Sequence, residues 1–339
     1  MSTLRHLSCA FICVLLLFAA RVNAQEAAPA PSPLPSQAGT QMVGSEDTIR
    51  VESDLVDLNV TVISRDPKSL VGQLEQKDFS VTEDGVTQEI SLFASAETPF
   101  DLVLLLDLSA STKDKLKLIR KTATNFVDAA RPTDRIAIVT FTDGMNIVAP
   151  LMLDREDLRT RIKKIEKPKG GTNFWDALRY VVETMLDSSR TTRRSAVVVM
   201  TDGVDNALPD VPGPGSLTTF DVLLSIVSRS EPIVIPIYLD TEREVKETRR
   251  PAYSASAYQT ARAQLQLLAN ESGSISYYAR KVEDLKDVYQ QVIRDLSTVY
   301  SIGYRPSKTE RDGSWRVVKV QLPRRPELAA RTRRGYFAK

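Results

Sequence analysis

Residues 101–111 read DLVLLLDLSAS, and this stretch decides the fold. Its first part, LVLLL, is a continuous apolar run, which is typical of a strand covered on both faces in a parallel sheet. The sequence then turns polar at Asp107 and places two serines, Ser109 and Ser111, before the next segment. Apolar residues recur at helical spacing through residues 116–130, so the chain passes directly from a strand to a helix.

The same alternation of strand and helix repeats along the chain. Further segments typical of strands are residues 135–141, 196–200, 233–239 and 274–278. Segments with helical periodicity are residues 155–165, 174–186, 217–228, 257–269 and 282–299. Strands separated by helices of this length indicate βαβ crossovers, so we predict an α/β fold with a doubly wound, mostly parallel sheet and helices on both faces. Pro236 interrupts one of these strands and lacks a ladder donor, which predicts a bulge or an early strand end there.

The two ends of the chain have the two-residue period of antiparallel strands. Apolar and polar residues alternate from Val56 to Val62, and Asp84-Gly85 is a strong hairpin signal because both turn positions need positive φ. Neither end has enough strands to hide an apolar face alone. We therefore predict that residues 48–98 and 299–339 pair into one small β-sandwich, with the α/β domain of residues 99–298 inserted between them. Independent packing of each end on that domain is the alternative.

The first residues have the form of a secretory signal. A basic start at Arg5 precedes an apolar run from Cys9 to Ala20, and small residues follow as far as Ala24. The run is shorter than the roughly 20 residues that a membrane-spanning helix needs. We expect residues 1–24 to be a signal peptide, residues 25–47 to be a disordered linker rich in Pro, Ala and Ser, and the protein to be exported, either periplasmic or secreted. An uncleaved anchor is the alternative.

Composition excludes several kinds of chemistry. The one histidine and both cysteines, His6, Cys9 and Cys13, lie in the expected signal peptide. Without them the chain lacks the residues for Ser-His-Asp or Cys-His catalysis, for His- or Cys-ligated zinc and for disulfides. Residues 25–339 have equal numbers of acidic and basic side chains, so we expect no nucleic-acid partner. No later apolar stretch approaches the roughly 20 residues of a spanning helix, so we also expect no membrane span after cleavage. We attribute the eleven basic residues against three acidic ones in residues 300–339 to solvated strand faces or to a patch for an acidic partner.

Hydroxyl and carboxylate groups gather where ligands bind in an open α/β sheet, at the carboxyl ends of the strands. Asp107, Ser109 and Ser111 follow one strand, Asp202 follows another, and Thr172 comes after two glycines before a helix. These hard oxygen donors suit one octahedral divalent ion that keeps several waters, which describes Mg²⁺ or Mn²⁺. Two negative charges leave such an ion electrophilic toward an incoming carboxylate. The alternative is that the serines cap a helix while the aspartates are solvated.

The spacing of these residues resembles the metal-ion-dependent adhesion site of von Willebrand factor type A domains. Thr172 and Asp202 lie 65 and 95 positions after Asp107, and the resemblance covers roughly residues 99–298. It implies that Ser109, Ser111 and Thr172 provide hydroxyl ligands. It also implies that the two aspartates act directly or through water and that a partner carboxylate completes the shell.

Two further features qualify this resemblance. Ala110 stands where glycine is frequent in the family. The segments DFSVTEDGVTQEISLF at residues 78–93, YSIGYRP at 300–306 and RRGYF at 333–337 resemble an exported subfamily of these domains that is abundant in acidobacteria. That subfamily implies no activity, so the resemblance informs the fold and the metal more than the biological role.

We expect an exported protein-binding module of the adhesion type, not an enzyme, that captures an acidic side chain of a protein partner through Mg²⁺. One alternative is a structural component of a cell-envelope assembly in which the metal site is incidental. Another is a metal-dependent hydrolase with Asp143 as a spare carboxylate. Asp143, Asp205 and Asn206 are expected in solvated turns, residues 241–250 in a solvated loop or helix turn at the rim of the site, and Trp175 in the core.

Overall fold

The computed structural model describes residues 55–66, 71–109, 115–167, 170–187, 193–242 and 253–338. The expected signal peptide, the expected linker and Ser111 lie outside the described residues. In the described part of the chain, no helix is both long and apolar enough to cross a membrane.

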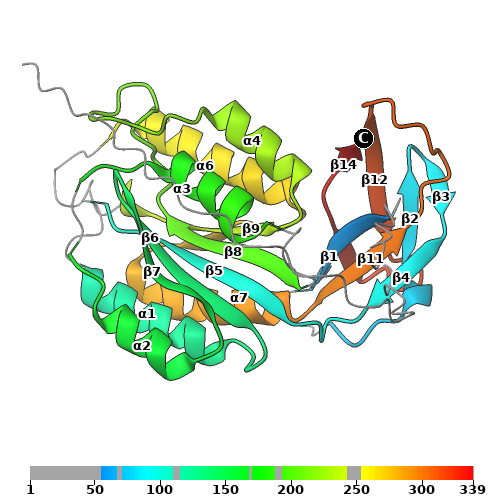
Figure 1. The fold of residues 1–339 in the computed structure, drawn as a ribbon, viewed down its shortest axis with the longest axis horizontal. Coiled ribbons are helices and arrows are strands. Elements are labelled where there is room, and N and C mark those ends of the chain that lie inside the picture. Colours follow the sequence, from blue (N-terminus) through cyan, green and yellow to red (C-terminus); the bar gives the residue numbers. More distant parts are fainter. Residues whose placement is uncertain are drawn as a thin grey trace, which may run out of the picture. The chain divides into compact units, whose positions relative to one another are not determined.

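A six-stranded sheet forms the centre of the α/β part, in the order β10-β9-β8-β5-β6-β7 (Figure 1). Five of its strands are parallel, and β7 runs antiparallel to β6 at one edge. The strands are β5 (Phe100–Asp107), β6 (Arg135–Phe141), β7 (Met145–Met152), β8 (Arg194–Thr201), β9 (Ile233–Leu239) and β10 (Tyr277–Ala279). The predicted doubly wound, mostly parallel sheet is therefore confirmed.

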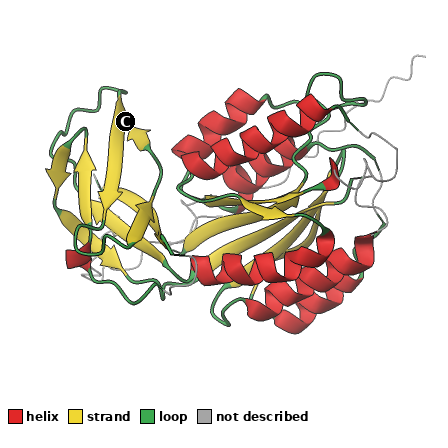
Figure 2. Cartoon of the chain, turned by 180° about the vertical axis from the view of Figure 1, so that it is seen from behind, coloured by secondary structure: helices red, strands yellow, loops and turns green. Residues whose placement is uncertain are grey.

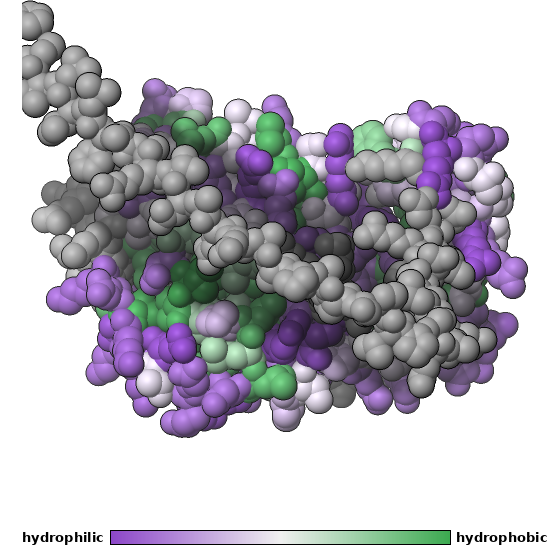
Figure 3. All heavy atoms as spheres, in the orientation of Figure 1, coloured by the Kyte–Doolittle hydropathy of each residue, from purple (hydrophilic) through white to green (hydrophobic). Residues whose placement is uncertain are grey.

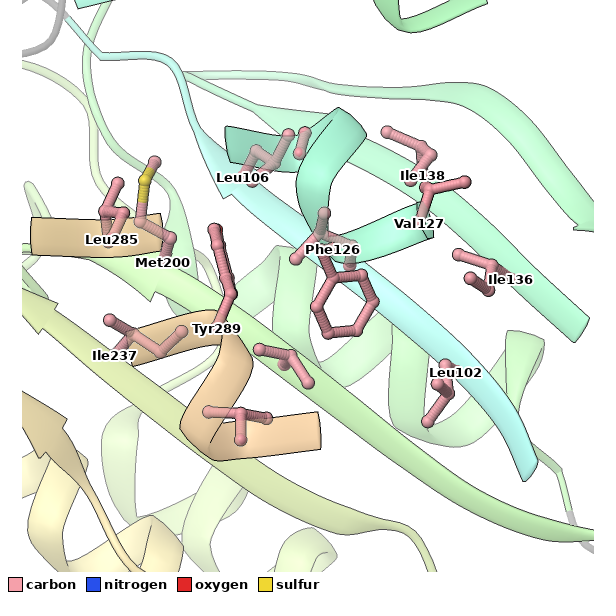
Figure 4. Packing of buried hydrophobic residues seen from close by; sticks show 14 of the residues in the cluster. Leu102, Leu106, Phe126, Val127, Ile136, Ile138, Met200, Ile237, Leu285 and Tyr289 are labelled. Atoms are coloured by element: carbon pink, nitrogen blue, oxygen red, sulfur yellow. The ribbon is translucent and has the colours of Figure 1, made fainter. Parts of the chain in front are cut away.

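Helices cover both faces of this sheet (Figure 2). One face packs against α1 (Leu116–Ala129), α2 (Arg155–Lys163) and α7 (Leu285–Leu296). The other face packs against α3 (Phe174–Tyr180), α4 (Phe220–Arg229) and α6 (Ala255–Glu271). Every residue of β5 is buried, as its unbroken apolar run predicts. Phe126 of α1 and Tyr289 of α7 meet over the sheet with ring centroids 5.5 Å apart (Figure 4).

The two ends of the chain pair into two antiparallel four-stranded sheets that share one apolar core. Their orders are β13-β1-β11-β4 and β14-β12-β2-β3, so each sheet takes strands from both ends of the chain. The strands are β1 (Val56–Ser64), β2 (Ser80–Glu83), β3 (Val86–Gln88), β4 (Ile90–Ala94), β11 (Val299–Tyr304), β12 (Trp315–Gln321), β13 (Leu328–Arg331) and β14 (Gly335–Phe337). Asp84 and Gly85 both have positive φ, 48° and 86°, in the predicted hairpin turn between β2 and β3. The sandwich and the insertion of the α/β part into it agree with the sequence prediction.

Several element boundaries differ from the prediction. The predicted helix at residues 217–228 begins only at Phe220, because the Asp176 carboxylate accepts the backbone N–H groups of Leu217 and Thr218 and holds them in a loop. The long C-terminal helix is divided into a 3₁₀ turn at Val282–Asp284 and α7, and Val299 already belongs to β11. The helix predicted for residues 174–186 ends as a π-helical turn at Val181–Met185.

The expected interruption at Pro236 is wrong. Strand β9 runs through Pro236, which pairs with Val199 of β8 without a shift of register. On the other side, β10 pairs with β9 only from Ile237 to Leu239. Pro236 therefore has a paired neighbour on one side only, and the ladder beside it is incomplete on the side of β10.

The molecular surface carries mostly polar side chains, with some apolar ones among them. Figure 3 shows hydrophilic side chains along much of the outer edge of the face in view, and apolar residues also reach that surface. Among the large apolar side chains of the described residues, Leu217 has the highest exposed fraction, 96%, in the loop before α4. The polar groups at the carboxyl ends of β5 and β8 are, by contrast, buried.

Candidate metal centre

Two buried carboxylates lie at the switch point of the sheet. The chain leaves β5 toward β6 on one side, whereas β8, β9 and β10 lie on the other side, so the strand order reverses beside β5. Asp107 is the last residue of β5, and Asp202 directly follows β8, its neighbour in the sheet. Their exposed fractions are 0% and 2%. This is the place where an open α/β sheet binds its ligands.

Hydrogen bonds fix the orientation of the Asp107 carboxylate. Oδ1 accepts the backbone N–H of Ser109 at 2.8 Å, in the turn that follows β5. Oδ2 accepts the hydroxyl of Thr201 at 2.7 Å, from the end of the neighbouring strand β8. The Ser109 side chain also hydrogen-bonds to this carboxylate, so the turn after β5 and the end of β8 together fix its orientation.

Asp202 is held by the same kind of pattern. Oδ1 accepts the backbone N–H of Val204 at 3.1 Å, and Oδ2 accepts the hydroxyl of Thr241 at 2.7 Å. Thr241 follows β9 in a helical turn, which is one of the two forms expected for this segment, but it is only 2% exposed, so the expected solvation is wrong at this residue. Residues 243–250 lie outside the described part. Each carboxylate is therefore oriented by a backbone N–H two residues further on and by a threonine hydroxyl from an adjacent loop or strand.

Thr172 lies in the loop before α3 and is 1% exposed. Its backbone is fixed on both sides by Asn206, whose Oδ1 accepts the Thr172 N–H at 3.1 Å and whose N–H donates to the Thr172 carbonyl at 2.9 Å. The Thr172 hydroxyl is buried and has no partner in hydrogen-bond geometry among the described residues. A buried hydroxyl without a partner is costly, so this atom fits a ligand to a metal or to a metal-bound water.

The two glycines before Thr172 make room for two neighbouring side chains. Gly170 has φ +88°, and a Cβ there would lie 2.6 Å from a carboxylate oxygen of Asp143. A Cβ at Gly171 would lie 2.5 Å from Nδ2 of Asn206. The Asp143 carboxylate and the Asn206 amide thus occupy the space that two methyl groups would need, and Gly170 has in addition a positive φ that favours glycine.

Two residues expected in solvated loops are instead buried in the wall of the site. Asp205 and Asn206 are 0% and 8% exposed, so that expectation is wrong. The Asp205 carboxylate accepts the Trp175 N–H at 3.0 Å and the Ser216 hydroxyl at 2.6 Å, which ties the loop after β8 to the start of α3. Trp175 itself is buried in the core, as expected. Asp143 is exposed in the turn between β6 and β7.

Burial and charge both act on the Asp107 carboxyl. Its pKa is raised to about 7, first by burial and then by the negative charge of Asp202, while hydrogen bonds from Thr201 and Ser109 act in the opposite direction. Two anionic groups held together in a buried site favour a divalent cation between them.

Tyr253, a residue not singled out from the sequence, lies near the same charges. Burial and then the carboxylates of Asp202 and Asp107 raise the pKa of its phenol, and the nearby Thr172 hydroxyl has a smaller effect in the opposite direction. The two hydroxyls are close to each other without meeting hydrogen-bond geometry. The phenol therefore stays neutral beside the site and adds no charge to it.

The described residues of the predicted ligand set therefore fit a hard divalent ion. Asp107, Ser109, Thr172 and Asp202 are all buried at the same edge of the sheet, and Ser111 lies outside the described residues. Among the described residues, no group of three or more His, Cys, Asp or Glu side chains could hold a metal. A site here would thus combine two carboxylates with hydroxyl and water oxygens, a set suited to Mg²⁺ or Mn²⁺ and not to a soft-ligand metal site.

The threonines and Asn206 could not be identified as supports from the sequence. Thr201 and Thr241 stand at or after strand ends, but only the neighbouring positions of β5, β8 and β9 bring their hydroxyls to the two carboxylates. The one sequence signal is that a threonine directly precedes Asp202.

Comparisons with known proteins agree with this fold. Residues 101–226 match the family of von Willebrand factor type A domains. A comparison with curated proteins found no match. Among solved structures, proximal thread matrix protein 1 from the mussel byssus, in a form with a zinc-occupied MIDAS motif, is 16% identical with a TM-score of 0.43. That match covers 60% of this chain and 49% of the mussel protein, so the chain corresponds to about half of its length.

Two bacterial structures are similar at the same level. The von Willebrand factor domain of the type V pili tip protein Mfa5 from Porphyromonas gingivalis is 13% identical over 58% of this chain and 94% of that chain, with a TM-score of 0.42. A von Willebrand factor type A protein from Catenulispora acidiphila is 14% identical over 66% of this chain and 52% of that chain, with a TM-score of 0.45. From the family match and the architecture of its central sheet, the chain contains a von Willebrand factor type A domain.

Proposed function

We propose that the protein is an exported binding module that captures an acidic side chain of a protein partner through Mg²⁺ or Mn²⁺. The observation that carries the proposal is the buried Thr172 hydroxyl, which has no hydrogen-bond partner among the described residues and belongs to the same edge of the sheet as two buried carboxylates. A polar atom in this position is explained by a ligand that the protein itself does not supply.

The side chains of the site would divide the work as follows. Asp107 and Asp202 would hold the cation by charge, and Ser109, Ser111 and Thr172 would offer hydroxyl oxygens. Thr201 and Thr241 orient the two carboxylates through the bonds described above. Outer-shell partners of this kind keep the ligands in place and raise metal affinity. When bound, the ion supplies an electrophilic centre for a carboxylate oxygen of the partner.

A binding role is favoured over catalysis by the groups present. The described edge of the sheet offers no histidine or cysteine, and its spare carboxylate, Asp143, lies exposed in the turn between β6 and β7. We therefore propose that the protein is not an enzyme. Metal-dependent turnover in esterase, phosphatase or nuclease assays, lost in Asp107→Ala, would contradict this part of the proposal.

Calorimetry tests the metal site directly. Chelator-treated protein is titrated with MgCl₂ and with MnCl₂, and we expect saturable binding at one site that is absent in Asp107→Ala and in Asp202→Ala. Asp143→Ala is the matched control, because it removes an exposed aspartate from the same edge without removing a proposed ligand. Equal binding in the wild type and both ligand variants would refute the site.

A second experiment tests the carboxylate partner. An array of peptides that contain Asp or Glu is compared with the same peptides carrying Asn or Gln, in Mg²⁺ and in EDTA. We expect binding only to the acidic peptides and only with the metal. Binding that persists in EDTA would instead favour a structural component whose contacts do not use the metal.

A further inference from the structure

Asn206 joins the loop after β8 to the loop that carries Thr172. Its Oδ1 accepts the Thr172 N–H at 3.1 Å, and its own N–H donates to the Thr172 carbonyl at 2.9 Å. Its Nδ2 donates to the Pro212 carbonyl at 2.8 Å. Both polar atoms of the amide are thus engaged with backbone groups, so Asn206 acts on the site through its neighbours and not as a ligand.

Two glycines fix the amide in this position. A Cβ at Gly171 would lie 2.5 Å from Nδ2 of Asn206, and a Cβ at Gly213, where φ is +100°, would lie 2.7 Å from the same atom. The amide therefore fills the space beside two different loops, one before α3 and one before α4. Asp205 strengthens the same junction, since its carboxylate accepts N–H groups from Trp175 and Ser216.

The Thr172 hydroxyl is the group whose position this arrangement controls. It is buried, it has no hydrogen-bond partner among the described residues, and its backbone is held on both the N–H and the carbonyl side by one residue. A ligand must be held to within a fraction of an ångström for a hard cation to accept it, and such precision comes from the residues behind the ligand.

We propose that Asn206 is a positioning residue of the metal site, which holds the Thr172 hydroxyl in place for the cation and links it to the loop of residues 207–218. This inference rests on the proposed function. It assigns to Asn206 a role in metal affinity that is exerted through Thr172 alone.

A double-mutant cycle separates this role from a merely structural one. Mg²⁺ and Mn²⁺ affinities are measured by calorimetry on the full chain for Asn206→Ala, Thr172→Ala and the double variant. We expect Asn206→Ala to weaken metal binding by on the order of 10- to 100-fold. In the Thr172→Ala background the same change should cause no further loss, because the hydroxyl it positions is already absent.

A conservative variant and a matched control complete the test. Thr172→Ser keeps the hydroxyl, so Asn206→Ala should again weaken metal binding in that background. Asn173→Ala removes an amide from the same loop whose Nδ2 donates to the Asp143 carbonyl at 3.0 Å and not to Thr172. We expect it to change the metal affinity by less than about twofold, within the range of a substitution that touches no ligand.

The outcomes separate the positioning role of Asn206 from the proposed metal-binding function on which it rests. A wild-type protein that binds neither metal would refute the proposed function itself. The wild type could also bind metal while Asn206→Ala lowers the metal affinity equally with Thr172 and with Thr172→Ala. That result would overturn the positioning role alone. If circular dichroism shows that Asn206→Ala does not fold, Gly171→Ala takes its place, because the new Cβ would displace the same amide. Losses of metal affinity from Gly171→Ala and Thr172→Ala that simply add would then overturn the inference.

Discussion

Asp107 gives the metal-free protein an unusual dependence on pH. The pKa of its carboxyl is about 7 in the folded protein, against the ordinary value of 3.8 expected in the unfolded chain. Between these values the folded state holds a proton that the unfolded chain has released. Raising the pH through this window therefore lowers the free energy of unfolding of the metal-free protein, by at most about 1.4 kcal/mol per pH unit.

Urea denaturation in EDTA at several values from about pH 4 to about pH 8 measures this effect. The wild type should lose stability as the pH rises, and Asp107→Asn, which cannot ionise, should lose much less. Saturating Mg²⁺ should restore the wild type at the upper end of this range, because the cation offsets the two charges. Parallel profiles for the wild type and the variant would show that Asp107 is not the group responsible.

The threonines behind the carboxylates make a second prediction for single residues. Thr201→Val and Thr241→Val keep the side-chain shape but remove the donors to Asp107 and Asp202. Each should lower the metal affinity by on the order of 10-fold or more in calorimetry. Thr124→Val is the control, since that hydroxyl donates to the Arg120 carbonyl within α1 at 2.9 Å. Unchanged affinity in both site variants would mean that the carboxylates are oriented without them.

The positions of the proposed ligands were easier to predict from the sequence than those of the residues that support them. Asp107 and Asp202 end or directly follow long apolar strands, so their place at the carboxyl edge follows from the pattern alone. The bonds from Thr201, Thr241 and Asn206 depend on which strands are neighbours and on how loops meet, and neither is encoded at a fixed spacing.

Among the elements, the loop before α3 permits a test of why it contains glycine. Gly170→Ala would place a Cβ 2.6 Å from the Asp143 carboxylate at a φ of +88°. Gly313→Ala is a matched control, because Gly313 has φ +70° but a Cβ there would have no other atom within 4 Å. The control should cost about 1–2 kcal/mol for the left-handed backbone alone, and Gly170→Ala should add to this the cost of displacing the exposed Asp143 carboxylate. Equal losses in chemical denaturation would show that contact with Asp143 is unimportant.

The elements themselves were predicted best where burial was complete. Strands β5 and β8 are buried at every residue and were visible as apolar runs. Strand β7 was missed, because it is half exposed, contains Pro150 and shifts its register against β6. The start of α4 was also misplaced, since tertiary bonds from Asp176 hold residues that have helical periodicity in a loop.

At the scale of the whole molecule, Arg194 binds both points where the chain crosses between the sandwich and the α/β part. Its guanidinium donates to the carbonyls of Ala96 and Thr98 before β5 and to the carbonyl of Val299 at the start of β11. It also lies over the Phe100 ring, 4.2 Å from the centroid. Burial lowers the pKa of this group to about 10, so it remains charged at neutral pH.

Arg194→Met should therefore destabilise the protein by about 2–4 kcal/mol in chemical denaturation, because these carbonyls lose a buried, charged donor. Arg159→Met is the control, since Arg159 forms only surface ion pairs with Asp128 and Glu156 and should change the stability by less than about 1 kcal/mol. If both variants lower the free energy of unfolding by similar small amounts, the two connections between the sandwich and the α/β part are held by strand pairing without Arg194.

The pairing of the two ends of the chain was predictable from the sequence, because neither end had enough strands to cover an apolar face. Their interleaving was not. Each four-stranded sheet takes two strands from each end, as in the order β13-β1-β11-β4. This arrangement depends on pairings between residues far apart in the chain, such as Val60 with Tyr300, for which no local pattern exists.

This interleaving has a mechanical consequence. The α/β part leaves the sandwich from β4 and returns on β11, and these two strands are paired side by side, Ala94 with Ser301. Tension applied between residue 55 and residue 338 would thus be carried by the sandwich and would bypass the α/β part. A force applied between the candidate metal centre and either end of the chain must instead pass through the two crossings that Arg194 holds together.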